Sequence, residues 1–150
     1  MAANTTFVSG AVLTAAQMNN LPWGQVGLAT KTTDQNVTTK ADLAGLSVTF
    51  TAVAGRVYEV SFTSTILANI ASTDVLVYIT DGTTTYSETF GTVVLNAYQT
   101  RTVVVQVTGL TAGSKTIKVQ GEAASSVIFY GTGIRASLAG KMIVKDIGAT

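Results

Sequence analysis

The chain has 150 residues and a formal net charge of +1, and only 11% of its residues are charged while 47% are hydrophobic. This length predicts a single domain with one core, and the low charge predicts a neutral, hydroxyl-rich surface that favours association. The nine basic residues are scattered along the chain, which excludes nucleic acid as an expected partner. With no His and no Cys, Ser-His-Asp and Cys-His catalysis and the zinc sites built on those ligands are excluded too.

The first residues predict neither export nor a membrane anchor. The start, MAANTTFVSG, has no basic stretch followed by an apolar one, so no secretory signal is expected. No run of about 20 apolar residues follows, so no membrane partner is expected. We therefore expect a protein that is made and kept soluble inside the cell that synthesises it, even if it later leaves that cell inside a particle.

A short helix is predicted over residues 14–21. Thr14-Ala15-Ala16-Gln17 fits a capping box, and Pro22 followed by Gly24 ends the helix. A helix of two turns is unstable alone in water, so it must dock on something. We expect residues 1–30 to form an N-terminal arm. Its predicted docking side chains are Phe7, Val12, Leu13, Met18, Leu21 and Trp23.

From residue 46 the hydrophobic period changes to two, which is typical of half-buried strands. Residues 46–52 and 56–66 both show this period, and a turn signal at 54–55 separates them. We therefore expect these two strands to form a hairpin. The side chains predicted to face inward are Leu46, Val48, Phe50, Ala52, Tyr58, Val60, Phe62 and Ile66.

Asp81-Gly82 stands between two β-rich runs and predicts a second hairpin, because Gly tolerates the positive φ of a tight turn. The strand before it, 75–79, and the later strand 102–107 are apolar on both faces. Such strands need cover on both sides, and in a chain this small another subunit is expected to supply one cover. The subunit-interface candidates are Leu76, Tyr78 and Val104.

Further short strands are predicted at 116–123, 126–131 and 141–148. Short strands at spacings of about ten residues, with Gly turns between them, favour an all-β fold of the β-sandwich or jelly-roll kind. The predicted organisation is an arm over residues 1–30, containing one small α-helix, and a β-sandwich domain over residues 36–147.

Side chains able to do chemistry are few and scattered. The acidic residues show no spacing typical of a catalytic pair, and no calcium-loop pattern occurs, so we interpret them as solvated or turn-capping groups. We expect no catalytic residue, no metal site and no cofactor. The residues concerned are Asp34, Asp42, Glu59, Asp74, Asp81, Glu88, Glu122 and Asp146.

Aromatic residues gather around the Asp81-Gly82 hairpin, and two interpretations of them remain open. They can fill the core or a subunit interface, or they can form a platform for a sugar. The candidate glycan contacts are Tyr78, Tyr86 and Tyr98.

The segment FVSGAVLTAAQMNNLPWG, residues 7–24, resembles a segment near the N-terminus of many tailed-bacteriophage virion proteins. In that segment an aromatic residue and a Gly precede a VLTAAxMN helix and a PWG-like break. The stretches DLAGLSVTFTAVAGRVYEVSF, RTVVVQVTGLTAGSKTIKVQ and MIVKDIG are similar to parts of the trimeric jelly-roll domains of phage fibres and decoration proteins.

The resemblance implies a non-enzymatic, homotrimeric virion component whose partners are major capsid or tail proteins. Because the chain has no long coiled coil or fibrous repeat, we expect a capsid decoration protein attached through its arm. The alternatives are a minor tail or tail-fibre protein, and a glycan-binding module on the virion surface. Whether the arm docks on the virion or on its own trimer stays open, as does the choice between head and tail.

Overall fold

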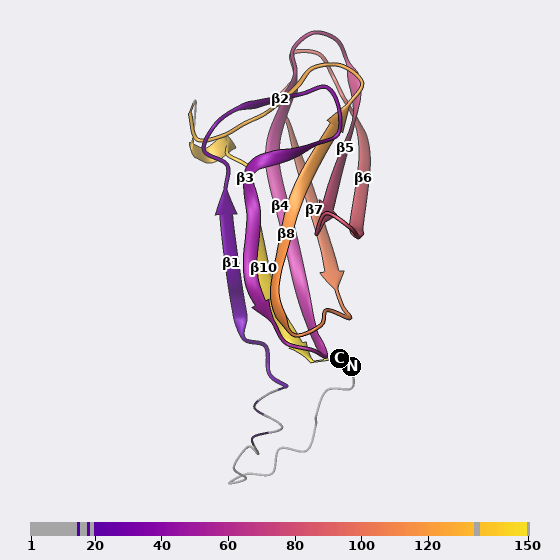
Figure 1. Ribbon diagram of the computed structural model, residues 1–150. Coiled ribbons are helices and arrows are strands. Elements are labelled where there is room, and N and C mark those ends of the chain that lie inside the picture. Colours follow the sequence, from indigo (N-terminus) through magenta and orange to yellow (C-terminus); the bar gives the residue numbers. More distant parts are fainter. Residues whose placement is uncertain (1–14, 16–17, 19, 134–135, 150) are drawn as a thin grey trace.

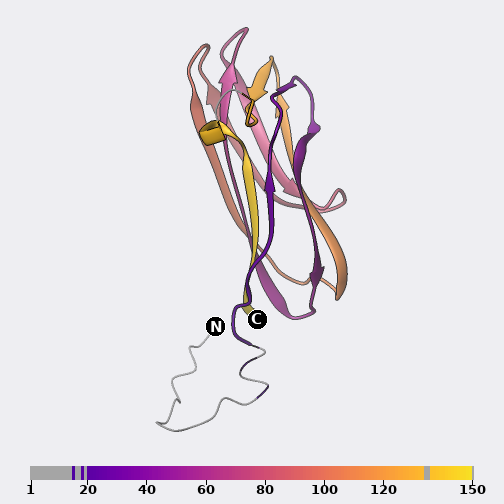
Figure 2. The same cartoon turned by 90° about the vertical axis from the view of Figure 1, so that its left-hand side faces the viewer.

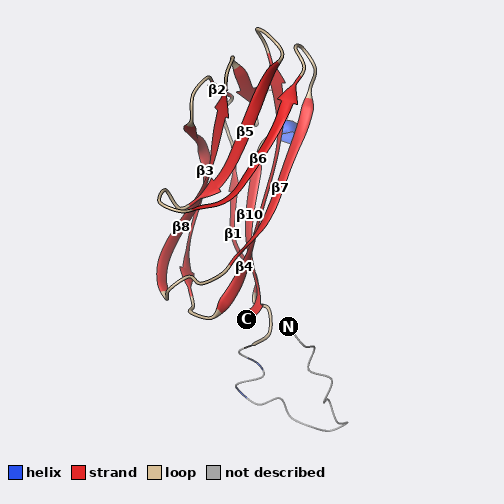
Figure 3. Cartoon of the chain, turned by 90° about the vertical axis from the view of Figure 1, so that its right-hand side faces the viewer, coloured by secondary structure: helices blue, strands red, loops and turns tan. Residues whose placement is uncertain are grey.

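The computed structural model of the chain describes residues 15, 18, 20–133 and 136–149. In it, two antiparallel sheets face each other across one apolar core (Figures 1 and 3). This confirms the predicted all-β sandwich. No helix among the described residues is long and apolar enough to cross a membrane. The elements are β1 (Gly24–Thr30), β2 (Gln35–Val37), β3 (Ala41–Ala52), β4 (Arg56–Ala68), β5 (Thr73–Thr80), β6 (Thr85–Val93), β7 (Gln99–Val107), β8 (Gly113–Ala123), β9 (Val127–Phe129), the 3-10 helix η1 (Ala136–Leu138) and β10 (Lys141–Ala149).

The long strand β4 organises the six-stranded sheet, whose order is β1-β10-β4-β9-β2 with β7 also paired to β4. Along one side of β4, β10 pairs with residues 56–63 and β9 pairs with Ile66–Ala68. Along the other side, β7 pairs with nine consecutive residues of β4. The facing four-stranded sheet has the order β3-β8-β5-β6.

The alternation of side chains in β3 and β4 places one apolar face of each strand in the core. All eight side chains predicted to face inward from these strands are buried, and Leu46, Val60 and Phe62 have no exposed surface. Burying these side chains removes apolar surface from water at about 25 cal/mol per Å², which is the main favourable contribution to folding. The inward faces predicted from residues 46–66 are therefore confirmed.

The predicted hairpin between residues 46–52 and 56–66 is wrong. β3 pairs with β8 in the four-stranded sheet, whereas β4 pairs with β10, β7 and β9 in the six-stranded sheet. The turn at 53–55, with Gly55 at φ +77°, crosses from one sheet to the other. Each strand buries its apolar face against the other sheet, so the alternation is satisfied without any hydrogen bond between the two strands.

The hairpin predicted at Asp81-Gly82 is confirmed, since β5 and β6 pair along their length. Its loop has four residues, 81–84, instead of the tight turn expected. The carboxylate of Asp81 accepts the backbone N–H groups of Thr83 at 2.8 Å and Thr84 at 2.7 Å, and Gly82 takes a φ of +97°. Asp81 therefore holds the loop closed by an Asx-type turn.

The sheet begins earlier in the chain than residue 36. Residues 24–30, the last part of the predicted arm, form β1, which pairs antiparallel with β10 at the edge of the six-stranded sheet (Figure 2). At Gly27 an added Cβ would lie 2.1 Å from Cγ1 of Val48 in the facing sheet. Glycine at this position lets β1 approach β3 closely, so residues 24–30 belong to the sandwich and not to the predicted arm.

The loops divide between the two ends of the sandwich. β1 begins, β10 ends and the β3–β4 turn lies at one end, which we call the arm pole (Figures 1 and 2). The loops 31–34, 69–72, 94–98 and 130–140 lie at the other end, which we call the distal pole. The start of β1 and the end of β10 therefore share one end of the molecule.

Gly27→Ala should lower the free energy of unfolding by about 1–3 kcal/mol, because the added methyl group overpacks against Val48. Gly133→Ala is the control, since no atom lies within 4 Å of its added Cβ, and it should change stability by less than about 0.5 kcal/mol. Urea unfolding measures both changes. The double variant Gly27→Ala with Val48→Ala should lose less free energy of unfolding than the sum of the losses in the two single variants. A loss equal to that sum would show that β1 is not in close contact with β3 at this point.

Candidate functional site

A buried ion pair closes the arm pole of the sandwich. Arg56, the first residue of β4, is 3% exposed and Asp146 of β10 is 1% exposed. The guanidinium donates from Nε and Nη2 to the two carboxylate oxygens of Asp146. One of these oxygens also accepts the backbone N–H of Gly148 at 3.0 Å. Bidentate geometry and the extra hydrogen bond offset the cost of removing both charges from water.

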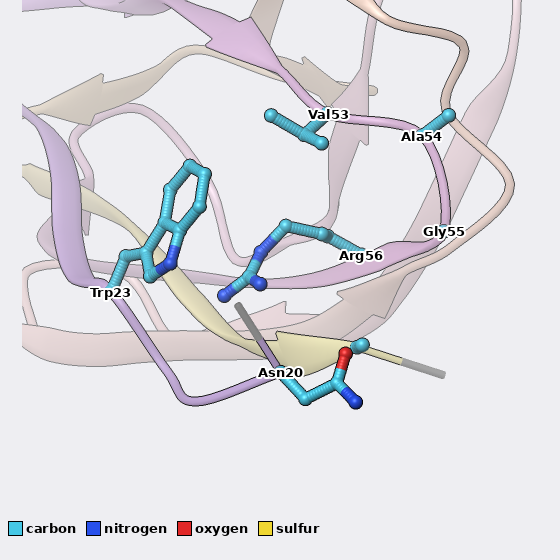
Figure 4. Close-up of a pocket in the computed structure, with 7 residues that line it drawn as sticks. Asn20, Trp23, Val53, Ala54, Gly55 and Arg56 are labelled. Atoms are coloured by element: carbon cyan, nitrogen blue, oxygen red, sulfur yellow. The ribbon is translucent and has the colours of Figure 1, made fainter. Parts of the chain in front are cut away.

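The same guanidinium holds the residues that lead into β1. Its Nη2 donates to the backbone carbonyl of Leu21 at 2.6 Å, and its central carbon lies 4.2 Å from the centre of the Trp23 ring. Figure 4 shows the indole and the guanidinium side by side. A cation over an indole face is favourable by about 0.5–1 kcal/mol at an exposed site. We call Leu21, Trp23, Arg56 and Asp146 the arm root.

A pocket of about 300 Å³ opens beside the arm root. The segment just before β1, the β3–β4 turn, the first residue of β4 and the last residue of β10 contribute to it (Figure 4). Apolar side chains around it stay open to solvent, with Val53 37% exposed and Trp23 55% exposed. The lining residues are Asn20, Trp23, Val53, Ala54, Gly55, Arg56 and Ala149.

The structure places three of the predicted docking side chains at the surface of the arm pole. Met18 is 56% exposed, Leu21 46% and Trp23 55%. Phe7, Val12 and Leu13 lie outside the described residues. Within the predicted helix 14–21, Ala15 and Met18 are helical and the N–H of Leu21 donates to the carbonyl of Met18 at 3.2 Å. The capping box at Thr14 and Gln17 lies outside the described residues.

The three candidate glycan tyrosines have different surroundings. Tyr78 is 6% exposed, with the Lys40 ammonium 3.8 Å from its ring centre. Its hydroxyl donates to Glu122 at 2.7 Å, and this hydrogen bond raises the pKa of Tyr78 to about 12. Tyr86 donates to Asp81 at 2.6 Å, and burial followed by this bond raises the pKa of Tyr86 to about 12. Both phenols are therefore neutral near pH 7.

Tyr98 is the member of this set with an open ring. It is 61% exposed and is the last residue of the loop before β7, at the distal pole. Its ring centre lies 5.6 Å from that of the buried Tyr130. The structure therefore brings Tyr98 together with Tyr130, a residue that the sequence did not single out, and gives Tyr78 and Tyr86 other partners.

The subunit-interface candidates lie on the outer faces of different sheets. Val104 projects from β7 on the six-stranded sheet and is 57% exposed. Leu76 projects from β5 on the four-stranded sheet and is partly exposed. Tyr78 lies on the same outer face as Leu76 but is almost buried. Their role as interface residues stays a prediction.

The acidic residues have structural partners within the described part of the chain. Asp34 accepts the N–H of Gly131 at 2.8 Å, and Asp42 accepts Lys118 at 2.8 Å and Gln120 at 2.7 Å. The hydrogen bonds from Lys118 and Gln120 hold the pKa of Asp42 below its usual range. No group of three acidic side chains among the described residues is arranged to hold a metal ion.

Asp146 corrects the interpretation of the carboxylates as solvated or turn groups. It is 1% exposed and paired with Arg56, which lies 90 residues away in sequence. The sequence does indicate that Asp146 faces inward, because Met142 and Val144 point inward from β10 and Asp146 continues the same period of two. An inward carboxylate needs a cation, but the sequence alone does not identify Arg56 as that cation.

No family model and no curated relative matches the chain. Among solved structures, it is similar to that of infectious bursal disease virus strain Gx, with 10% identity and a TM-score of 0.47 over 85% of this chain and 38% of that one. It is also similar to the CBM22-1-GH10 modules of the Clostridium thermocellum xylanase 10B complexed with xylohexaose, with 13% identity and a TM-score of 0.39 over 85% of this chain and 29% of that one.

A third similar structure is the carbohydrate-binding module CBM6cm-2 of the Cellvibrio mixtus lichenase 5A in complex with cellotriose. Its identity is 14% and its TM-score 0.34, over 88% of this chain and 94% of that one. This chain spans little more than a third of the bursal-virus chain that it matches. At such identities and TM-scores, the likeness says nothing about what this chain binds.

Arg56→Met should lower the free energy of unfolding by roughly 3–5 kcal/mol, because it leaves the Asp146 carboxylate buried without its cation. Trp23 is the chain's one tryptophan, so tryptophan fluorescence reports on the arm root alone. Quenching by acrylamide should rise in Arg56→Met under native conditions.

The control for this prediction is Lys145→Met on β10, the strand that carries Asp146. Lys145 lies 3.5 Å from Glu59 in an exposed pair, so its loss should cost less than about 1 kcal/mol and leave Trp23 quenching unchanged. Equal losses of stability in both variants, or unchanged quenching in Arg56→Met, would contradict the role given to the arm root.

Proposed function

We propose that this chain is a non-enzymatic structural protein of a tailed-bacteriophage virion, and that it is a homotrimeric capsid decoration protein held to the particle through residues 1–23. The observation that carries this proposal is the arm root. A buried ion pair fixes the backbone at Leu21, and the side chains just before β1 remain exposed at one pole. An apolar segment on a fixed base is suited to insertion between the subunits of a larger assembly.

The sequence of that segment supports the phage assignment. Residues 7–24 carry the VLTAAQMN and PWG elements typical of virion proteins, and Trp23 and Leu21 of this motif are the residues that Arg56 contacts. A large aromatic such as Trp23 is the kind of residue that dominates interface energy. In a trimer, binding of one arm raises the effective concentration of the other two arms at the particle surface. The trimer can therefore bind tightly even if each arm binds weakly.

The polar side chains of the sandwich support a structural role. Asp81 closes a hairpin, Asp146 holds the arm root, and Asp42 bridges β3 and β8. Lys31 is fully buried and donates to Gln35 at 2.7 Å and to the carbonyl of Ala44 at 3.1 Å. The hydrogen bonds and ion pairs of these groups hold loops and strands together. Attachment, and not turnover, is therefore the activity we assign to the chain.

The alternative location is the tail, where the same architecture serves a minor tail or tail-fibre protein. The alternative function is a glycan-binding module on the virion surface. Tyr98 favours this second candidate, because its ring is 61% exposed and lies against the buried Tyr130 at the pole opposite the arm. Exposed aromatic rings with a fixed orientation stack well on sugar rings.

Leu13→Asp in the full-length chain should reduce occupancy on particles assembled without this protein at least tenfold, because a charge replaces an apolar docking side chain. The matched control is Ile70→Asp, which adds the same charge at the distal pole, where Ile70 is 68% exposed. Co-sedimentation with particles measures occupancy. Full occupancy by Leu13→Asp would overturn attachment through the arm, and electron microscopy of decorated particles would show whether the sites lie on head or tail.

A glycan array distinguishes the glycan-binding module from the decoration protein. A pure decoration protein should give no saturable sugar binding with the full-length chain. Saturable binding that disappears in Tyr98→Ala, with the fold retained by circular dichroism, would establish the glycan-binding module in its place.

A further inference from the structure

An apolar row crosses the outer face of the six-stranded sheet. The strand register places Leu28 of β1 opposite Ile143 of β10, Ile143 opposite Ser61 of β4, and Ser61 opposite Val104 of β7. Leu28 is 55% exposed and Val104 57%. We call Leu28, Ile143, Ser61 and Val104 the apolar row. Side chains directly opposite on antiparallel strands lie about 4.5–5.5 Å apart, so Leu28 and Ile143 are direct neighbours, and the small polar side chain of Ser61 separates Ile143 from Val104.

Basic side chains flank this row on β10. Lys141 and Lys145 stand two residues to either side of Ile143 and point to the same outer face. Lys145 lies 3.5 Å from Glu59 in a half-exposed pair, whereas Lys141 has no salt bridge among the described residues. With Lys141 and Lys145 against Glu59, the surroundings of the row carry a net charge of 2 − 1 = +1.

A second apolar pair lies on the outer face of the other sheet, at its edge. Leu76 of β5 stands opposite Phe90 of β6, and Phe90 is 61% exposed. β6 is the last strand of the four-stranded sheet, and Figure 3 shows it beside β5 along that side of the molecule. We call Leu76 and Phe90 the β6 rim.

Carboxylates surround the β6 rim. Glu122 stands opposite Leu76, and Asp74 and Glu88 lie two residues before Leu76 and Phe90 on the same outer face. None of the three has a salt bridge within the described part of the chain. Two cations lie nearby: Lys40 lies over the Tyr78 ring, and the guanidinium of Arg101 donates to the carbonyl of Thr92, two residues after Phe90, at 2.7 Å. Three carboxylates against two cations give the rim a net charge of 2 − 3 = −1.

We propose that the apolar row of one copy packs on the β6 rim of a second copy. Both surfaces expose apolar side chains beside charged ones, and their net charges have opposite sign, so row against rim is attractive while row against row brings Lys141 toward its own equivalent. The inference deepens the proposed homotrimer and rests on it.

This contact joins two different surfaces of the chain, so it is heterologous. The row crosses one face from β1 to β7, whereas the rim lies at the edge strand of the opposite sheet, so successive copies are rotated relative to one another. A heterologous contact whose rotation closes gives a ring, and three copies then complete the trimer. Val104 and Leu76, the sequence-derived interface candidates, contribute from opposite sides of the same contact.

Engineered cysteines test which surfaces meet, because the chain has no cysteine of its own. We would make the full-length double variant Val104→Cys with Phe90→Cys, the two single variants, and the control pair Val104→Cys with Ile70→Cys. Each would be treated with a short bismaleimide reagent and analysed on denaturing gels. The double variant should give covalent dimer and trimer, while the single variants and the control pair stay monomeric.

Three outcomes would overturn the proposed contact. Dimers formed by Val104→Cys alone would show that the row meets its own equivalent across a two-fold axis. A trimer mass by light scattering without any adduct in the double variant would show that other surfaces form the trimer, and would leave the proposed homotrimer standing. A monomeric full-length protein would remove the homotrimer itself, while particle occupancy still tests the virion role separately.

A charge at the apolar row provides a second readout. Val104→Asp should raise the dissociation constant of the oligomer about tenfold or more, because it buries an unpaired carboxylate beside the acidic rim. Ile70→Asp is equally exposed in the monomer and should leave the oligomer unchanged. An unchanged dissociation constant in Val104→Asp would contradict the contact even in the absence of cross-linking data.

Discussion

The arm pole depends on one buried ion pair, Arg56 with Asp146. Its guanidinium joins β4 to β10 and at the same time holds the carbonyl of Leu21 and the ring of Trp23. A buried charge that loses its partner is strongly destabilising, so neither residue can change without weakening this end of the sheet. The same constraint that closes the sandwich therefore also fixes the point from which the N-terminal segment leaves it.

The two poles and the two outer faces of the sandwich expose different sets of side chains. The arm pole presents exposed apolar side chains on a fixed base, and the distal pole presents loops with the Tyr98–Tyr130 pair. Between them, the outer faces carry exposed apolar residues beside charged ones. A chain with so few charged residues gains little solubility from repulsion, and the proposed contact between copies would cover the apolar residues of both faces.

The sequence predicted the inward side chains of β3 and β4 well, because a period of two directly reports which face of a strand is buried. The predicted hairpin between β3 and β4 was wrong, because alternation does not indicate which strand lies next to which. The sequence-based prediction also missed β1, since residues 24–30 contain two glycines and show weak alternation. At the arm root, Trp23 was identified from its motif, whereas Arg56 and Asp146 lie 90 residues apart and only the fold brings them together.

The central claim is that the arm pole attaches the protein to the virion, and the orientation of the sandwich on the particle tests it most directly. Electron cryomicroscopy of decorated particles would resolve this orientation. The account predicts density in which the β3–β4 turn and the end of β10 face the particle, while loops 69–72 and 94–98 point into solvent. Density with the distal pole against the particle and the arm root in solvent would contradict it.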